Sequence, residues 1–489
     1  MNHWTPAFSL EKLPVGGAKL YQQGRDQVAV FRPAEGEIYA VDNRCPHEGY
    51  PLVQGDLKGC TLTCCWHNYK FDLRSGACLK GDEAVRTYVA EEHDGTVAVT
   101  LQPPDPEVER PAAWASLRTA LWRGRTAQAL RDTARLLSLG VSGLELLGFL
   151  AAEDGRRGEW GCTHVLAVAA DLATLPDAEL DGIDATVLLS VPVEMVSDSH
   201  RRFDPRPAAP PQPCPADQLA ARLAEAIEAE DLAVAEGLVR HAMRTEVPLE
   251  AIEQALMEPV AAHFLDFGHP AIYLSKLLPF VQRLARVRRD LVEEVLVGLV
   301  TNIVNATRED TLPAWRRFHV AVEASAARAT TWRAQTGAVD DDLAERLAEA
   351  NGPEAVAQTV AALDAGASLE AVAAALMVAG AERMLRFDPR IDVRLDVQDD
   401  WLSVSHIVTF TTAVHTLVRR WPHPRAARWL LMGARMVGHH KVLDAPEARR
   451  SSWSSRPWDA EAFAALLAAG VPAALDHVED GLRTAPGEL

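Results

Sequence analysis

Residues 45–67, CPHEGYPLVQGDLKGCTLTCCWH, contain two pairs of candidate metal ligands that decide the fold of the N-terminal part. Each pair joins one cysteine to one histidine, and sixteen residues separate the first pair from the second. Two thiolates and two imidazoles fit either a tetrahedral zinc site or a 2Fe-2S cluster in which histidines bind one iron. Zinc sites of this composition place their histidines about three to five residues apart, whereas each histidine here lies beside its own cysteine. The spacing therefore favours the cluster and leaves zinc as the alternative.

The longer stretch CPHEGYPLVQGDLKGCTLTCCWHNYKFDLRSGACL, residues 45–79, resembles the Rieske ferredoxin family. The resemblance extends over about residues 4–102 and includes both ligand loops and the strand around Phe71. It implies a small all-β domain that holds a Rieske-type 2Fe-2S cluster and transfers one electron at a time. Two cysteines would bind the inner iron and two histidines the outer iron: Cys45, Cys64, His47 and His67.

Departures from the family pattern bear on the reduction potential. Respiratory Rieske proteins carry a further cysteine in each ligand loop, and those two form a disulfide. Tyr50 and Trp66 occupy these places here, so the resemblance implies no such bridge. Gly49 is expected to let the first loop turn tightly, and Asn68 stands where the family usually has glycine, although asparagine tolerates a positive φ. These departures favour a potential near the low end of the Rieske range, about −150 mV.

The composition of the 489-residue chain changes after residue 102. Residues 1–102 contain short apolar or alternating runs between Gly, Asp and Asn, which predicts β structure. Residues 103–113, PPDPEVERPAA, contain four prolines and are expected to form a linker. The rest is rich in Ala, Leu, Glu and Arg at helical spacing. We therefore expect a multidomain protein, with a small all-β domain followed by a large all-α domain.

The charge and the cysteines limit the expected partners and location. The net charge of −19 repels phosphate groups, so neither nucleic acid nor an anionic membrane is an expected partner. No stretch of eighteen apolar residues occurs without a charged residue, so no transmembrane helix is expected. The N-terminus has no basic segment followed by an apolar core, so no secretory signal is expected. Five of the seven cysteines lie between positions 45 and 78, which indicates a metal site in a reducing compartment. We expect a cytoplasmic protein.

The helical part, residues 114–450, contains a degenerate internal repeat. Each copy has a Leu-Glu pair at the start of one helix, a histidine before a second apolar helix, and a third apolar helix followed by a proline. An insertion, RFDPRIDVRLDVQDDW, lengthens the third copy. We expect about three similar units, each of roughly four helices, and then a C-terminal helical tail. Their expected bounds are 114–210, 217–316 and 343–450 for the units and 451–489 for the tail.

Three histidines occupy equivalent places in these copies: His164, His269 and His406. Each follows a candidate helix cap and is expected to open a buried helix; the caps are Thr163, Gly268 and Ser405. A threefold repeat could bring three imidazoles to one iron, zinc or copper ion. Nearby carboxylates could complete that site: Asp266, Glu258 and Glu309. The alternative is that a repeated histidine only caps or packs a repeated helix.

A Rieske cluster transfers an electron but transforms no substrate itself. A site that accepts the electron is therefore expected, and the helical part could contain it. Asp266-Phe267-Gly268-His269 begins like the iron motif of ring-hydroxylating oxygenases, but position 274 is leucine, so we reject that family for the C-terminal part. Residues 269–280, HPAIYLSKLLPF, resemble the questin-oxidase-like helical proteins, which implies oxygenation of a polyketide-like aromatic. No Gly-x-Gly-x-x-Gly turn follows a predicted strand, so a separate NAD(P)H-dependent reductase or ferredoxin is expected.

Three functions remain open from the sequence. In the first, the cluster feeds a metal site in the helical domain, which acts on oxygen or on a small apolar or aromatic substrate. In the second, the chain is a non-enzymatic electron carrier whose helical domain docks a partner. In the third, the cluster only senses redox state. Free Rieske ferredoxins are single small domains, so the long helical part favours the oxidoreductase.

Overall fold

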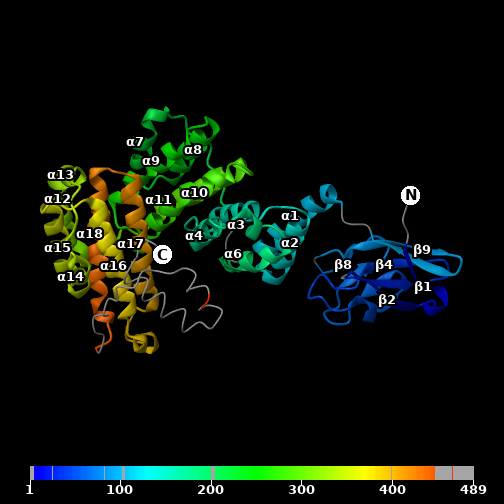
Figure 1. Ribbon diagram of the computed structural model, residues 1–489. Coiled ribbons are helices and arrows are strands. Elements are labelled where there is room, and N and C mark those ends of the chain that lie inside the picture. The colour runs from blue at the N-terminus through cyan, green and yellow to red at the C-terminus, as the bar shows by residue number, and fades with distance from the viewer. Residues whose placement is uncertain are drawn as a thin grey trace. The chain divides into compact units, whose positions relative to one another are not determined.

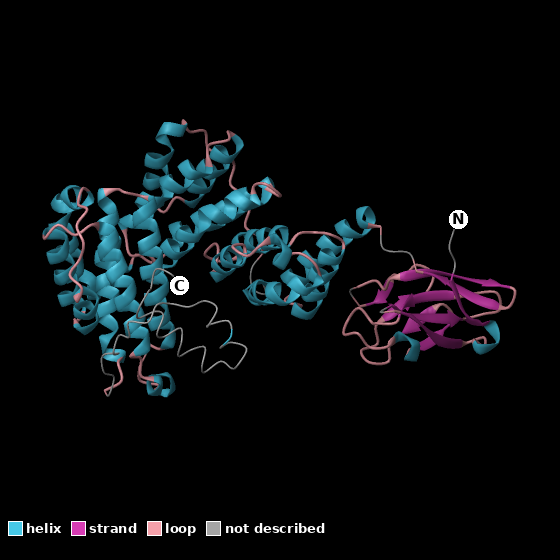
Figure 2. Cartoon of the chain, in the orientation of Figure 1, coloured by secondary structure: helices cyan, strands magenta, loops and turns pink. Residues whose placement is uncertain are grey.

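The computed structural model describes most of the chain, and its parts are shown in Figure 1. The described residues are 5–24, 26–81, 83–101, 105–199, 204–397, 399–446 and 465. The chain divides into two compact units. The first contains the residues up to Leu146 together with 176–202, and the second contains Leu147–Leu175 and the residues from 203 onward. Figure 2 shows the strands confined to the N-terminal domain and helices through the remainder.

The N-terminal domain is all β, as the sequence predicts. Its strands are β1 (Thr5–Ser9), β2 (Gly17–Gln23), β3 (Asp26–Arg32), β4 (Tyr39–Asp42), β5 (Asp56–Lys58), β6 (Thr61–Thr63), β7 (Lys70–Asp72), β8 (Cys78–Lys80), β9 (Thr87–His93) and β10 (Thr96–Thr100). Within the described residues they form two antiparallel sheets, ordered β1-β10-β9-β4-β3-β2 and β5-β6-β7-β8.

Strand β3 explains how the larger sheet supports the ligand loops. Successive side chains of a strand point to opposite faces, and β3 is apolar on both faces. Val28 and Val30 enter a core with the terminal strands. Ala29 and Phe31 enter a second core, which also contains Cys45 and Cys64. The two cysteines are therefore anchored in the packed interior of the domain.

The first unit also contains helices. They are α1 (Pro106–Trp122), α2 (Thr126–Ser138), α5 (Asp177–Leu180), α6 (Thr186–Ser199) and the start of α3 (Gly143–Arg157). The expected linker at 103–113 is wrong from residue 106 onward, because α1 begins there. Proline is favoured at the first position of a helix, and the Asp105 side chain caps α1 by accepting from the Glu107 N–H at 3.0 Å. The sequence prediction treated every proline as a helix breaker, and so it did not predict the start of α1 at Pro106.

The second unit is α-helical. Its helices are the remainder of α3, α4 (His164–Leu172), α7 (Leu219–Glu228), α8 (Leu232–Arg244), α9 (Leu249–Ala262), α10 (His269–Leu284), α11 (Arg289–Asn305), α12 (Arg316–Ser325), α13 (Ala329–Arg333), α14 (Leu343–Glu349), α15 (Gly352–Asp364), α16 (Leu369–Leu385), α17 (Trp401–Arg420) and α18 (Ala427–His439).

Two groups of five helices in this unit repeat one packing pattern. In both α7–α11 and α14–α18 the first helix packs on the second and the third, the second packs on the fifth, and the fourth packs on the third and the fifth. The repeat thus has five helices rather than about four, because two helices, not one, precede the helix that begins with each Leu-Glu pair. The third apolar helix expected in each copy is the fifth helix of each group, where Val304 of α11 and Val437 of α18 are buried.

The expected first copy, 114–210, is not one body, because α3 and α4 belong mainly to the second unit while α1, α2 and α6 belong to the first. Helix α17 is long and apolar enough to cross a membrane by length and composition. It packs on α10, α16 and α18, and side chains such as Phe410 and Leu417 are buried, as in the core helix of a helical domain. The predicted tail, 451–489, lies outside the described residues except for Ala465.

Candidate functional site

The two ligand loops of the β domain have the same backbone design. In the first, the Cys45 N–H donates to the Tyr50 carbonyl at 2.9 Å and the Gly49 N–H donates to the Cys45 carbonyl at 2.7 Å. In the second, the Cys64 N–H donates to the Tyr69 carbonyl at 2.8 Å and the Asn68 N–H donates to the Cys64 carbonyl at 3.1 Å. The fourth residue after each cysteine, Gly49 or Asn68, has a positive φ, 76° and 59° respectively. Asn68 thus adopts the left-handed conformation for which the family uses glycine.

The four predicted ligands form two pairs on these loops, one of buried cysteines and one of histidines. Cys45 and Cys64 are 3% and 1% exposed, whereas His67 lies at the surface. The Nδ1 atoms of His47 and His67 lie 3.1 Å apart. Two nitrogens about 2.1 Å from one metal lie about 3.0 Å apart at a right angle and about 3.4 Å apart at a tetrahedral angle. The two histidines therefore fit one iron bound by both imidazoles, and the two buried thiols share one core.

Two aromatic residues, Tyr50 and Trp66, occupy the positions at which respiratory Rieske proteins have their disulfide cysteines. The rings of Tyr50 and Trp66 contact each other with centroids 5.4 Å apart, so this pair joins the two loops. His47 stacks on Tyr69 at 4.6 Å. Cys65 is exposed and its thiol donates to the Gln54 carbonyl at 3.3 Å, so it faces away from the four ligands.

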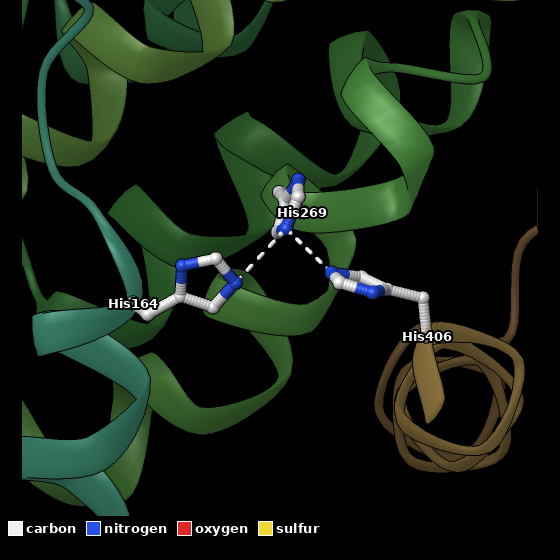
Figure 3. Close-up of side chains that lie close together, drawn as sticks. All are labelled: His164, His269 and His406. Atoms are coloured by element: carbon white, nitrogen blue, oxygen red, sulfur yellow. Dashed lines mark hydrogen bonds between the residues drawn. The ribbon is translucent and has the colours of Figure 1, made fainter. Parts of the chain in front are cut away.

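The second cluster of candidate ligands lies in the helical unit, where His164, His269 and His406 come together (Figure 3). His269 is central: its Nε2 lies 3.1 Å from Nε2 of His164 and 2.8 Å from Nε2 of His406. All three ligand nitrogens lie within 4.8 Å of one another. The short distances match the roughly 3.0 Å expected for adjacent nitrogens about 2.1 Å from one metal. We call these three residues the trihistidine cluster.

Hydrogen bonds determine which nitrogen of each ring faces the cluster. Nδ1 of His269 lies 2.7 Å from the Asp266 carbonyl, and Nδ1 of His406 lies 2.7 Å from the Leu402 carbonyl. A carbonyl only accepts, so both rings are protonated on Nδ1 and present a lone pair on Nε2. Two lone pairs 2.8 Å apart repel unless a cation or an extra proton lies between them. This pattern of outer carbonyls and inner lone pairs is typical of histidines that bind a metal.

The electrostatic environment keeps His164 and His406 neutral. Partial desolvation of its ring, with His269 and His406 beside it, lowers the pKa of His164 to about 4, although part of the residue is exposed to solvent. Burial also lowers the pKa of His406. Both imidazoles are therefore uncharged near neutral pH, which is the form that binds metal ions. Repeated helix starts alone do not require three imidazoles to meet, so the structural alternative from the sequence does not account for this geometry.

A strained turn, Asp266-Phe267-Gly268, holds His269 at the start of α10. All three residues have positive φ values, 43°, 54° and 89°. Two buried acids hold the turn and the chain before it: Glu309 accepts from the Phe267 N–H at 2.8 Å, and Asp310 accepts from the Phe264 N–H at 3.0 Å. Strain of this kind persists where surrounding contacts impose it, and it gathers at functional sites.

Replacing Gly268 by Ala is expected to disrupt this turn and the cluster together. A Cβ at position 268 would lie 2.3 Å from Cδ2 of Phe410, in addition to the cost of the positive φ. We expect a loss of about 3 kcal/mol or more in the free energy of unfolding, together with displacement of His269 from the other two imidazoles. Gly182→Ala is the matched control, because Gly182 has φ 82° but open space around its Cβ position. Equal losses in urea unfolding of both variants would contradict this account.

The expected helix start at His406 is wrong. Helix α17 begins at Trp401, and Asp400 rather than Ser405 is its cap, accepting from the Leu402 N–H at 2.9 Å. His406 therefore lies one turn inside the helix, because the acidic end of the insertion supplied an earlier cap. His164 and His269 do open α4 and α10, after Thr163 and Gly268.

Other residues singled out from the sequence take separate places. Of the candidate carboxylates, Asp266 Oδ2 lies 3.5 Å from Nδ1 of His269, Glu309 holds the turn, and Glu258 pairs with Arg425 at 3.1 Å. A further histidine of this region, His263, binds Asp310 at 3.1 Å and is not a member of the trihistidine cluster.

Two neighbours of the cluster were not predicted. Tyr273, four residues after His269 on the same face of α10, has its ring centroid 5.7 Å from that of His269. Asp154 is buried and accepts from the Thr163 backbone N–H at 2.6 Å, which fixes the cap of α4. The His-x3-Tyr spacing could have indicated Tyr273. No local pattern indicates Asp154, because ten residues and a turn separate it from His164.

Comparisons with known proteins concern the β domain. Residues 3–91 match the family model described as Rieske [2Fe-2S] domain. The chain is 34% identical over 96 residues to the 3-phenylpropionate/cinnamic acid dioxygenase ferredoxin subunit of Photorhabdus laumondii, a match that covers 19% of this chain and 90% of that protein. The N-terminal domain is thus a Rieske domain with a 2Fe-2S electron-transfer cluster.

Two further relatives are larger proteins. The chain is 51% identical over 49 residues to a 4beta-methylsterol monooxygenase of Methylococcus capsulatus, covering 10% of this chain and 13% of that protein. It is 37% identical over 79 residues to Cholesterol 7-desaturase nvd of Hemicentrotus pulcherrimus, covering 16% of this chain and 17% of that protein. The chain therefore spans less than a fifth of the length of either relative.

Proposed function

This chain belongs to the Rieske [2Fe-2S] family through its N-terminal domain. We therefore propose that it is an oxidoreductase whose 2Fe-2S cluster passes electrons to a metal held by the trihistidine cluster. The convergence of three Nε2 atoms is the observation that carries the proposal. Three protein ligands leave coordination positions open, as in catalytic rather than structural metal sites. His164 is exposed, so oxygen or a small substrate can reach the ion.

Iron is the metal that this pairing favours. Zinc has no redox chemistry, so it could not use the electrons that the cluster carries. Imidazole ligands suit iron and copper as well as zinc. A bound iron would supply redox chemistry and a binding position for oxygen. His269 and His406 keep their Nδ1 protons on backbone carbonyls, which orients both Nε2 lone pairs toward the ion.

The proposed reaction is oxygenation of a small apolar or aromatic substrate. One oxygen atom enters the substrate and the other leaves as water, which consumes two electrons and two protons. The cluster carries one electron at a time, so it must be reduced twice in each turnover. A separate NAD(P)H-dependent reductase or ferredoxin is the proposed source of these electrons. The relatives named above include an oxygenase and a dioxygenase ferredoxin, which supports this class of reaction.

Metal analysis before and after chelation tests the proposal. The purified chain is expected to contain three irons and two acid-labile sulfides, two of the irons belonging to the cluster. EDTA should remove the third iron, because the trihistidine cluster is open to solvent, and should leave the cluster on its buried cysteines. Two irons before and after chelation, in protein purified anaerobically with iron, would instead favour the electron carrier with a docking domain.

A further inference from the structure

A cavity of about 580 Å³ lies in the helical unit, away from the residues of the trihistidine cluster. Helix α12, the start of α15 and the end of α18 line it. Its walls are largely apolar and include Phe318, Ala321 and Val356. Pockets for small molecules have volumes of roughly 300–1,000 Å³, apolar walls and a few placed polar groups. This cavity has the size and the walls of such a site.

The charged groups of the cavity all have one sign. Arg317, Arg435 and Lys441 line it, and none of its described lining residues is a carboxylate. This is unusual in a chain with a net charge of −19, where acidic residues outnumber basic ones. The first residues of α15, from Gly352, lie against Arg435, and the positive end of a helix adds to the same potential. The cavity therefore attracts anions.

Arg435 is the group that most needs an anionic partner. Its guanidinium lies over the Trp315 ring at 4.9 Å and is partly buried. No described carboxylate lies within ion-pair distance of it, and burial lowers its pKa. Lys441, in contrast, donates to the Glu349 backbone carbonyl and lies 3.9 Å from the Glu349 carboxylate, and Arg428 on the same helix as Arg435 pairs with Glu323 at 3.4 Å. A partly buried charge without a partner is costly, and a guanidinium binds carboxylate or phosphate oxygens in paired hydrogen bonds.

We propose that this cavity binds an amphipathic organic anion, with its anionic oxygens on Arg435 and its apolar body against Phe318, Ala321 and Val356. The apolar walls exclude a free inorganic anion as the preferred ligand, and the volume excludes a macromolecule. The site does not depend on the function proposed for the trihistidine cluster.

Calorimetric titration of the full chain with three probes tests the site. Decanoate is expected to bind, while decanol, which lacks the charge, and inorganic phosphate, which lacks the apolar body, should bind at least about 10-fold more weakly. Equal affinity for decanoate and decanol, or for decanoate and phosphate, would overturn the proposal.

Variants locate the binding. Arg435→Gln should weaken decanoate binding by about 10-fold or more, and Arg428→Gln, on the same helix but outside the cavity, should not. Ala321→Glu brings a carboxylate into the cavity and should also block binding, which guards against a folding defect peculiar to Arg435→Gln. His406→Ala should retain full affinity for decanoate. Loss of affinity in His406→Ala with none in Arg435→Gln would place the anion on the trihistidine cluster and overturn the proposal.

Discussion

Replacing His269 by Ala is expected to lower reductase-supported oxygen uptake by about 100-fold or more. Loss of a residue that only supports a metal ligand costs 10–100-fold, so loss of a ligand should cost at least as much. His269 also lies between the other two imidazoles, at 3.1 and 2.8 Å, so its removal leaves no close pair of donors. Oxygen uptake should be measured with NADH, a supplied reductase and the full chain.

One histidine provides a matched control for this variant. His415 lies on α17 with His406 and is not a member of the trihistidine cluster. His415→Ala should retain most activity, and it should bind the same number of irons as the parent chain. Uptake by His269→Ala equal to that of the parent would exclude a catalytic role for the trihistidine cluster, whatever its geometry.

Replacing Cys64 by Ala is expected to abolish the 2Fe-2S cluster and the reductase-supported activity. Cys64 is buried in the core beside Cys45, where burial raises the pKa of the Cys45 thiol to about 11. Metal binding must displace that proton, so the free energy of cluster assembly is coupled to the folding of these loops. The variant should lose two irons, both sulfides and the visible absorption. It should keep the iron of the trihistidine cluster, whose ligands lie in the other compact unit.

Cys65→Ser is the control for the cluster ligands. Cys65 lies between two ligands in sequence but is exposed, with its thiol on the Gln54 carbonyl. This variant should assemble the complete cluster with an unchanged spectrum. A colourless Cys65→Ser protein, or a Cys64→Ala protein that retains two sulfides, would show that the ligand assignment is wrong.

The β domain could be predicted from the sequence because its ligands are local. Each Cys-His pair lies within one loop, and the left-handed conformation of Asn68 follows from its place in the pattern. The contact between Tyr50 and Trp66 could not be predicted, because absence of a disulfide does not determine what packs in its place. The all-β and all-α division was also confirmed, since alternating and helical periodicities differ strongly.

In the helical part, the order of the motifs was informative and their boundaries were not. The repeat singled out His164, His269 and His406, which the structure brings together, but His406 lies one turn inside α17, because the start of α17 depends on a cap inside an insertion. Helix α1 began among prolines because Asp105 and Pro106 together make a good start. The cavity beside Arg435 unites residues from α12, α15 and α18, so no local pattern could indicate it.

A single-turnover experiment measures directly whether the 2Fe-2S cluster passes its electron to a metal held by the trihistidine cluster. The 2Fe-2S cluster of the full chain is first reduced without oxygen and then mixed rapidly with oxygenated buffer and substrate, while its visible absorption is followed. We expect the 2Fe-2S cluster to reoxidise quickly in the parent chain and about 100-fold more slowly in His269→Ala. Equal rates of reoxidation, with the cluster intact in both proteins, would contradict this expectation.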